Sequence, residues 1–331
     1  MVGNAFIRAL WVGALLSQPA AAAIAVDDSV AATATSISKA VFAGGSLWLL
    51  TDTGHLSSVS PNDHRQVDAP IPGAIFDLWV QDGEPAALSR HDPRAASWSI
   101  WHRIHDKWSS ATIILPQKDE HYVGAGSSAG SLAVLTTRRL INIRGRQQES
   151  LPVAWEPERL PALATMLVTD SAVYVGYNAG EWGGWIRAVD RSTGKVTPVA
   201  AEFGDPVTGL ALEPNGCVAL SMGLIHMGFQ SGGVGEFCGE RARRVYTKTV
   251  RDQETEPFFG IAAAGGQLWA IGADGLYRIA PDGAVQTVPM PAFSQMGNVT
   301  VSFDLPQFAL VLTGVNRHLA VSGATPLFAP R

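Results

Sequence analysis

A recurring spacing constrains the fold of this chain more than any single motif. Short apolar runs that follow a turn occur at intervals through the sequence. They begin at Leu47 (LWLLT), Ala86 (AALSR), Leu132 (LAVLT), Val173 (VYVGY), Val218 (VALSM), Leu268 (LWAIG) and Leu310 (LVLTG). The successive intervals are 39, 46, 41, 45, 50 and 42 residues, which is the length range of a four-stranded unit repeated around a ring.

Residues 256–291 show the unit most clearly, as the segments EPFFGIAAAGG, QLWAIGADG, LYRIAPDG and AVQTVPMP. The corners between these segments are Gly265-Gly266, Ala273-Asp274-Gly275 and Pro281-Asp282-Gly283. Gly accepts the positive φ of a tight hairpin, and Asp can bond to its own backbone there. The segment is therefore predicted to be a four-stranded antiparallel sheet.

Seven such units cover residues 36–330 almost completely. The predicted fold class is all-β, a seven-bladed β-propeller of four-stranded antiparallel blades, in a single domain over residues 36–331. Six or eight blades are alternatives if the second or the long fifth unit is divided differently. The ring could close through an outer strand from residues 31–36, or its two ends could abut.

The segment GIAAAGGQLWAIGADGLYRIAPDGAVQTVPMP (260–291) resembles the repeat of streptogramin-lyase-type propellers and of the periplasmic propellers of two-component sensors. The resemblance covers this blade well and about three blades loosely. In such repeats Leu-Trp fills the layer between blades and Asp-Gly forms the turn. The resemblance therefore implies an architecture and carries no activity or catalytic residue to this chain.

The first 25 residues differ from the rest. They contain one early cation, Arg8, an apolar run from Ala9 to Leu16, and small residues up to Ala-Ile-Ala at 23–25. This order is typical of a secretory signal peptide, and the apolar run is too short to span a bilayer. We expect residues 1–25 to direct export, residues 26–35 to form a short N-terminal segment, and the mature protein to be periplasmic or secreted.

Composition argues against several partners. The formal net charge is −5 with both signs scattered along the chain, whereas a nucleic-acid surface needs clustered positive charge. No later stretch is apolar for 18 residues, so no membrane span is expected. The sequence contains no H-E-x-x-H, P-loop or EF-hand motif, and neither a metal nor a cofactor is predicted. Residues 126–130 match G-x-S-x-G, but the strands expected on both sides predict a hairpin turn instead of a nucleophile elbow.

Cys217 and Cys238 are the only cysteines of the chain. In an exported protein such a pair favours a disulfide over a metal-binding or redox role. Cys217 begins the second strand of the fifth unit and Cys238 lies on its third, so a hairpin that pairs them is centred between Met227 and Gly228. Closing a loop of this size stabilises the fold by about 3 kcal/mol.

Two connections between the second and third strands are long and glycine-rich, YNAGEWGGW (177–185) in blade four and GLIHMGFQSGGVGEF (223–237) in blade five. Connections at this point of a blade lie on one face of the ring, where long loops commonly carry function. Both combine aromatic side chains with a carboxylate and a polar partner, which suits a carbohydrate or a loop of a partner protein. The predicted ligand-binding residues are Tyr177, Asn178, Glu181, Trp182, His226, Phe229 and Gln230.

Three further segments are expected on the same face. SRHDPRA (89–95) belongs to blade two. QKDEHY (117–122) and RDQETEP (251–257) lead into inner strands, and they are expected to bring acidic groups towards the central pore.

Two functions of different classes follow from these residues. The preferred one is a non-catalytic binding module that recognises a protein or a glycan through blades four and five, because no acid–base constellation follows from the spacing. The alternative is a propeller lyase or hydrolase in which His226 is the general base and Glu181 or Glu236 is the acid or a metal ligand. A quinone-dependent dehydrogenase is disfavoured, because neither eight tryptophan-rich blades nor an axial metal site is evident.

Overall fold

The computed structural model describes residues 37–60, 65–90, 97–155, 163–199, 203–289, 298–305, 308–314 and 325–326. The predicted signal peptide, the N-terminal segment and the closing strand at 31–36 lie outside these residues. Within them the regular structure is β-strand apart from one 3-10 turn, so the fold is all-β, as predicted. None of the described residues belongs to a helix of the length and apolarity needed to cross a membrane.

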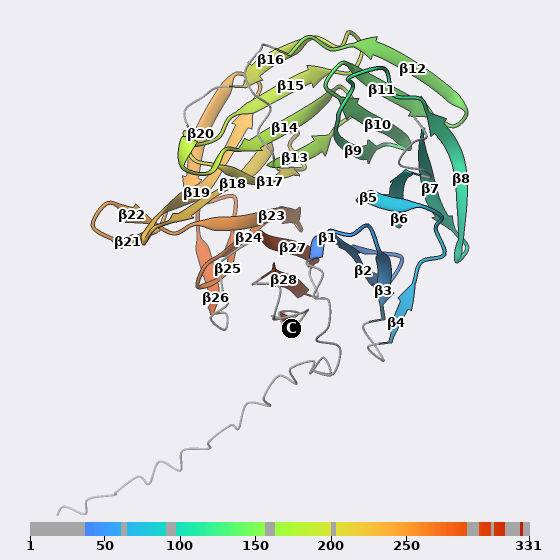
Figure 1. Cartoon of the computed structure of the whole chain (residues 1–331). Coiled ribbons are helices and arrows are strands. Elements are labelled where there is room, and N and C mark those ends of the chain that lie inside the picture. The colour runs from blue at the N-terminus through green and yellow to red at the C-terminus, as the bar shows by residue number, and fades with distance from the viewer. Residues whose placement is uncertain are drawn as a thin grey trace, which may run out of the picture.

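Six four-stranded antiparallel sheets are arranged around a common axis, each with its first strand innermost (Figure 1). Blades one to three consist of β1 (Ile37–Ala43), β2 (Ser46–Thr51), β3 (Leu56–Val59) and β4 (Gln66–Asp68); β5 (Ala74–Gln81), β6 (Glu84–Arg90), β7 (Trp98–Ile104) and β8 (Lys107–Ile114); and β9 (Tyr122–Ser128), β10 (Ser131–Thr136), β11 (Arg139–Arg144) and β12 (Gln147–Pro152). Blades four to six consist of β13 (Leu163–Val168), β14 (Ala172–Asn178), β15 (Ile186–Asp190) and β16 (Val196–Val199); β17 (Val207–Leu212), β18 (Val218–His226), β19 (Phe229–Cys238) and β20 (Arg241–Tyr246); and β23 (Phe258–Ala264), β24 (Gln267–Gly272), β25 (Gly275–Ile279) and β26 (Val285–Pro289).

The prediction of seven four-stranded blades is wrong, because the described residues form six. In the part of the chain that the structure describes, the last unit is a sheet of three strands, β27 (Asn298–Asp304), β28 (Phe308–Gly314) and β29 (Thr325–Pro326). β29 pairs directly with β28. β27 packs against β23 on one side and β1 on the other, so this sheet completes the circle (Figure 1).

The hydrophobic core lies in layers between adjacent sheets. Between blades two and three, for example, Leu88 and Ile100 pack with Val134 and Ile141, all four fully buried. Neighbouring residues on a strand point to opposite faces, and Leu268 and Trp269 accordingly serve the layers on the two sides of blade six. Each blade therefore depends on both neighbours for its stability.

Glycines let the inner strands approach one another closely near the axis. A Cβ added to Gly209 of β17 would lie 3.2 Å from the Cα of Gly260 in β23. A Cβ added to Gly260 would lie 2.8 Å from the Cβ of Val301 in β27. The positions of Gly209 and Gly260, where blades five and six and the last sheet converge, therefore leave no room for a side chain of their own.

Two local predictions are confirmed. Cys217 and Cys238 form a disulfide with a Cα–Cα distance of 4.6 Å, and β18 pairs with β19 about a turn at Met227 and Gly228. The bridge closes the end of this hairpin that lies opposite its tip. The G-x-S-x-G match is the hairpin between β9 and β10, with its two serines on β9.

Candidate functional site

In blade four, the connection after β14 folds into a short 3-10 turn, η2 (Gly180–Trp182). Oδ1 of Asn178 accepts a hydrogen bond of 2.9 Å from the N–H of Gly180, which starts the turn. A Cβ on Gly183 would lie only 2.3 Å from the carbonyl oxygen of Gly204, so a glycine is needed where the connection packs against the chain that leads into blade five. The turn buries none of its residues, and the side chain of Trp182 is 82% exposed.

In blade five, residues 223–237 are not the loop that was predicted. They extend β18 and β19 into one long hairpin, in which a two-residue turn joins His226 to Phe229. Met227 and Gly228 both have positive φ, at 49° and 85°, which matches the turn geometry that fits the twist of a hairpin. The hairpin tip carries Ile225, Met227 and Phe229 with exposed side chains.

The two connections meet at one ion pair. Nε2 of His226 lies 3.1 Å from Oε2 of Glu181, and the two side chains are 47% and 49% exposed. β18 also packs against η2. The structure thus brings together His226 and Glu181, which the sequence placed on separate blades.

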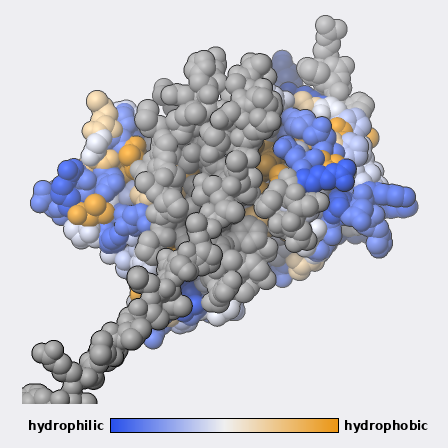
Figure 2. Space-filling model, turned by 90° about the horizontal axis from the view of Figure 1, so that it is seen from below, coloured by the Kyte–Doolittle hydropathy of each residue, from blue (hydrophilic) through white to orange (hydrophobic). Residues whose placement is uncertain are grey.

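We call the surface formed by Glu181, Trp182, His226, Met227 and Phe229 the blade four–five rim. Of the eleven large apolar side chains that are exposed among the described residues, three lie on it. On the side of the molecule shown in Figure 2, the hydrophobic residues that are coloured form small separate groups among hydrophilic ones. The rim is a group of exposed apolar side chains beside the contact between His226 and Glu181.

Three predicted ligand-binding residues have other positions. Tyr177 is only 1% exposed and stacks on Trp185 with ring centroids 5.3 Å apart, and its burial raises the pKa of its hydroxyl. It is a core residue because the last residues of β14 point into the layer between blades three and four. Asn178 holds its own turn. Gln230 is half-buried and pairs with Ile225. This pair is one position along the hairpin from the pair of His226 and Phe229, so the side chains of Gln230 and Ile225 point to the opposite face.

Glu236, the other predicted acid, lies far from His226. It pairs with Ala219, seven residues along β18 from His226, which is about 23 Å in an extended strand. Its Oε1 accepts a hydrogen bond of 2.7 Å from Nε of Arg243 on the next strand. Among the described residues, no three His, Cys, Asp or Glu side chains are arranged to hold a metal ion.

Sequence reasoning missed Ile225 and Met227. Both lie in the segment that was identified, but only the hairpin register shows that their side chains are exposed at its tip. The centre of the hairpin between Met227 and Gly228, which the cysteine positions already indicated, was the signal that could have found them.

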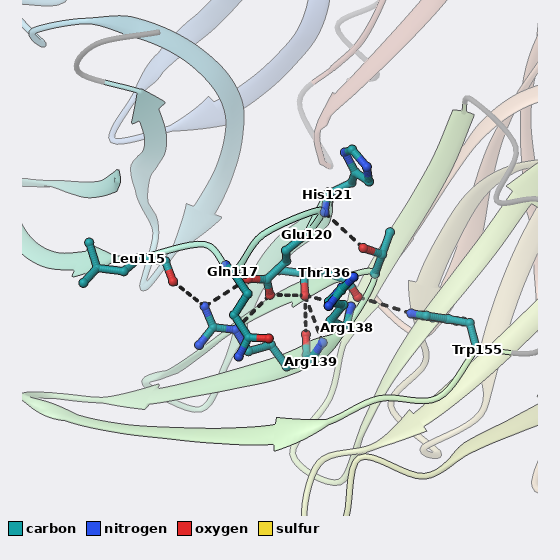
Figure 3. A network of polar contacts seen from close by, with 9 residues as sticks. Leu115, Gln117, Glu120, His121, Thr136, Arg138, Arg139 and Trp155 are labelled. Carbon is teal, nitrogen blue, oxygen red and sulfur yellow. Dashed lines mark hydrogen bonds and ion pairs between the residues drawn. The ribbon is translucent and has the colours of Figure 1, made fainter. Parts of the chain in front are cut away.

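In the segment QKDEHY, Glu120 is bound within its own blade. The side chain of Glu120 is fully buried, with its Oε1 2.8 Å from Nε of Arg139 and 2.6 Å from the hydroxyl of Thr136 (Figure 3). Burial alone would raise the pKa of this carboxyl, but the hydrogen bonds from Arg139, Thr136 and the N–H of Gln117 hold the pKa of Glu120 below its usual range. The carboxylate fastens the turn of its own blade.

The segment RDQETEP is also structural. It forms most of a small hairpin, β21 (Thr249–Arg251) and β22 (Glu254–Thr255), which projects beside blade five (Figure 1). Arg251 and Glu254 pair across it at 2.7 Å, and the buried Glu256 accepts a hydrogen bond from the N–H of Asp274. Of SRHDPRA, only Ser89 and Arg90 are described, at the end of β6, and the rest lies outside the described residues.

No protein family model matches this sequence, and no curated protein matches it significantly. Many solved structures share its fold. YCF48 from Cyanidioschyzon merolae has 11% identity and a TM-score of 0.58, over 90% of this chain and 97% of that one. A second YCF48 structure, with D1 peptide bound, has 13% identity and a TM-score of 0.56, over 91% and 95% of the chains.

Two further structures belong to the groups that the repeat resembles. A catalytically inactive virginiamycin B lyase from Staphylococcus aureus, solved with quinupristin, has 15% identity and a TM-score of 0.56, over 91% and 96% of the chains. The extracellular domain of a putative one component system from B. thetaiotaomicron has 14% identity and a TM-score of 0.51, over 90% of this chain and 38% of that one. At these identities the likeness concerns the β-propeller fold alone.

Proposed function

We propose that this protein is an exported binding module that recognises a segment of a partner protein through the blade four–five rim. The observation that carries the proposal is the set of exposed apolar side chains at the rim, Trp182, Met227 and Phe229. Large apolar side chains that are left in water on neighbouring connections typically mark an interaction surface. The fold is also that of YCF48, which has been solved with a peptide bound.

A protein segment suits this surface better than a glycan. A sugar needs several hydrogen-bonding groups around an aromatic ring, but His226 and Glu181 already bind each other, and Oδ1 of Asn178 is used by its turn. Trp and Phe provide large rigid contact areas, and the flexible side chain of Met adapts to an apolar partner. The half-exposed ion pair would orient the bound segment.

The test is a selection of ligands from a random peptide library on the folded protein, followed by affinity measurements on variants. Trp182→Ala combined with Phe229→Ala should weaken binding by about thirtyfold or more, because truncating a central aromatic residue costs about 2 kcal/mol. The free energy of unfolding should change by less than about 1 kcal/mol. Val250→Ala is the matched control, since Val250 is as exposed as Phe229 but lies on β21.

Selected peptides that bind the double variant as tightly as the native protein would remove the rim from the proposal. A glycan array run in parallel tests the other ligand class. Glycans that bind the native protein and not the double variant would replace the protein ligand by a carbohydrate.

The export part of the proposal is supported by the sequence of residues 1–25 and by the disulfide, which forms in oxidising compartments. Intact mass spectrometry of the protein recovered from outside the cytoplasm should show a chain that starts close to Val26. A full-length chain found only in the cytoplasm would contradict export.

One observation favours an enzyme as second candidate, namely the 3.1 Å contact between His226 and Glu181 in a half-exposed position. A carboxylate beside an imidazole can orient it as a general base. Because a lyase with the same fold was solved with quinupristin, that compound is the first substrate to try. Consumption of quinupristin that disappears in His226→Ala would establish this function, and consumption that persists would reject this arrangement.

A further inference from the structure

A cavity of about 560 Å³ lies within the ring. It is lined by the inner strands of blades four, five and six, by β27, and by Ser38 of β1. Asn178, Gly180 and Ile225 also line it, so the cavity extends to the base of the blade four–five rim. Its volume falls in the range of pockets that enclose small molecules, about 300–1,000 Å³.

The lining of this cavity carries no charge among the described residues, because it includes no Asp, Glu, Lys, Arg or His. Half of the lining residues are apolar, among them Ile261, Val301 and Phe303, and the others are glycines, Ser38, Asn178 and three threonines. An ion placed there would lose its hydration without gaining a partner of opposite charge, which is costly.

Most hydroxyl groups of the lining are bonded to the main chain. Thr208 donates to the carbonyl oxygen of Phe258 at 2.8 Å, Ser38 to that of Leu50 at 3.1 Å, and Thr300 to that of Ile37 at 3.4 Å. With its hydroxyl engaged, a threonine offers a ligand mainly its methyl group. These residues therefore add apolar surface to the cavity.

Charges on the neighbouring inner strands are paired with one another. Lys39 of β1 donates to the buried carboxylate of Asp77 on β5, and the hydroxyl of Tyr122 on β9 donates to the same carboxylate. Lys39, the residue next to Ser38 in the sequence, is therefore already bound to a carboxylate.

We propose that this cavity binds one small, uncharged molecule that combines an apolar body with a hydrogen-bond acceptor at one end. Its apolar body would lie against Ile261, Val301 and the threonine methyl groups. The polar end of the ligand would reach Asn178. Oδ1 of Asn178 already accepts a hydrogen bond from the turn, so the side chain of Asn178 would offer the ligand its amide NH₂ group. The site is distinct from the exposed side chains of the rim, and it does not depend on the proposed protein partner.

The experiment uses two fluorescent probes of similar shape, neutral N-phenyl-naphthylamine and its anionic relative anilinonaphthalene sulfonate. The neutral probe should bind the native protein at one saturable site, and the sulfonate at least about tenfold more weakly, since its charge has no partner in the cavity. Equal affinity for the two probes, or no saturable binding of the neutral one, would overturn the proposal.

A matched pair of variants locates the bound probe. Thr165→Trp places a large ring in the cavity and should weaken binding of the neutral probe by at least about tenfold. Thr197→Trp makes the same change on the exposed face of β16 in the same blade and should leave binding unchanged. Equal binding by both variants would show that the probe lies elsewhere.

Two further variants remove ambiguity. If Thr165→Trp unfolds, Ser38→Asp introduces a carboxylate at the exposed edge of the cavity and should weaken neutral-probe binding to a similar extent. Trp182→Ala with Phe229→Ala should leave the neutral probe bound, whatever its effect on a peptide partner. Loss of probe binding in that double variant would place the probe on the rim and overturn the cavity assignment.

Discussion

The connection between the second and third strands does opposite things in blades three and five. In blade three it is a short turn whose Thr136 and Arg139 are bound by the buried carboxylate of Glu120 (Figure 3). In blade five it is the tip of a long hairpin, with Met227 and Phe229 exposed to solvent. The same position in the repeat therefore serves stability where polar groups are buried together, and is exposed to solvent where apolar groups form the proposed recognition surface.

The largest effect is expected from breaking the blade three network. Glu120→Ala should lower the free energy of unfolding by about 3 to 5 kcal/mol, because it leaves the guanidinium of Arg139 largely buried without its partner. Urea unfolding measures the loss. Glu254→Ala is the control, because its partner Arg251 is mostly exposed to solvent and that pair should contribute little to stability.

Peptide affinity at the rim should be the same in the Glu120 and Glu254 variants, provided that it is measured where both are folded. If Glu120→Ala prevents folding, Glu120→Gln retains an acceptor for Thr136 and should lose less. Equal destabilisation by the Glu120 and Glu254 changes would show that burial of the network is not what stabilises the turn.

The disulfide lies at the end of the blade five hairpin opposite the exposed tip. Replacing Cys217 and Cys238 by Ser should cost about 3 kcal/mol of unfolding free energy, since the bridge spans 21 residues. Because the bridge lies opposite the tip, binding at the rim should persist in the folded variant. A calorimetric titration with a selected peptide that showed loss of binding in a folded variant would mean that the bridge positions the tip.

The repeat could be read from the sequence because it depends on local features. Strand-forming runs and Gly or Asp corners recur at intervals of 39 to 50 residues, and the cysteine positions indicated the register of the blade five hairpin. The number of four-stranded blades could not be obtained in this way. β29 pairs directly with β28, and a pairing between segments well separated along the chain leaves no local signal.

The candidate site was predicted in its location and only partly in its residues. Trp182, His226 and Phe229 are exposed as expected, but Tyr177 is buried and Glu236 lies far along the hairpin. The sequence alone does not show whether the side chain of an aromatic or acidic residue lies in a core layer or at the rim. Strand register decides between these places, and a slip of one residue reverses the face of every side chain.

Tyr177 and Trp182 sharpen the comparison within blade four. The hydroxyl of Tyr177 is buried and has no hydrogen-bond partner among the described residues. Tyr177→Phe should therefore raise the free energy of unfolding by up to about 1 kcal/mol and leave peptide affinity unchanged. Trp182→Ala should do the reverse, with weaker binding and little change in stability. Thermal unfolding and peptide titration of both variants decide this, and weaker binding in Tyr177→Phe would show that the core of the blade shapes the rim.

The smallest effect is expected at the base of the blade five hairpin. Glu213 lies between β17 and β18 beside Glu236, whose other neighbour is Arg243. Burial, followed by the charge and hydrogen bond of Glu236, raises the pKa of Glu213 above its usual value. The folded protein thus holds this proton more tightly than the unfolded chain, so stability falls as pH rises from about 4.3, the ordinary value of a glutamate, through the higher folded pKa.

Glu213→Gln removes this dependence. The variant and the native protein should have the same urea midpoint at about pH 3, where the carboxyl is protonated in both states, and the variant should have the higher midpoint at about pH 7.5. Glu149→Gln, on the exposed strand β12, is the control and should show no such divergence. A native protein more stable than Glu213→Gln at the higher pH would mean that the attraction of Arg243 outweighs burial and the repulsion from Glu236. The base of the hairpin would then be held by its charges, as the turn of blade three is.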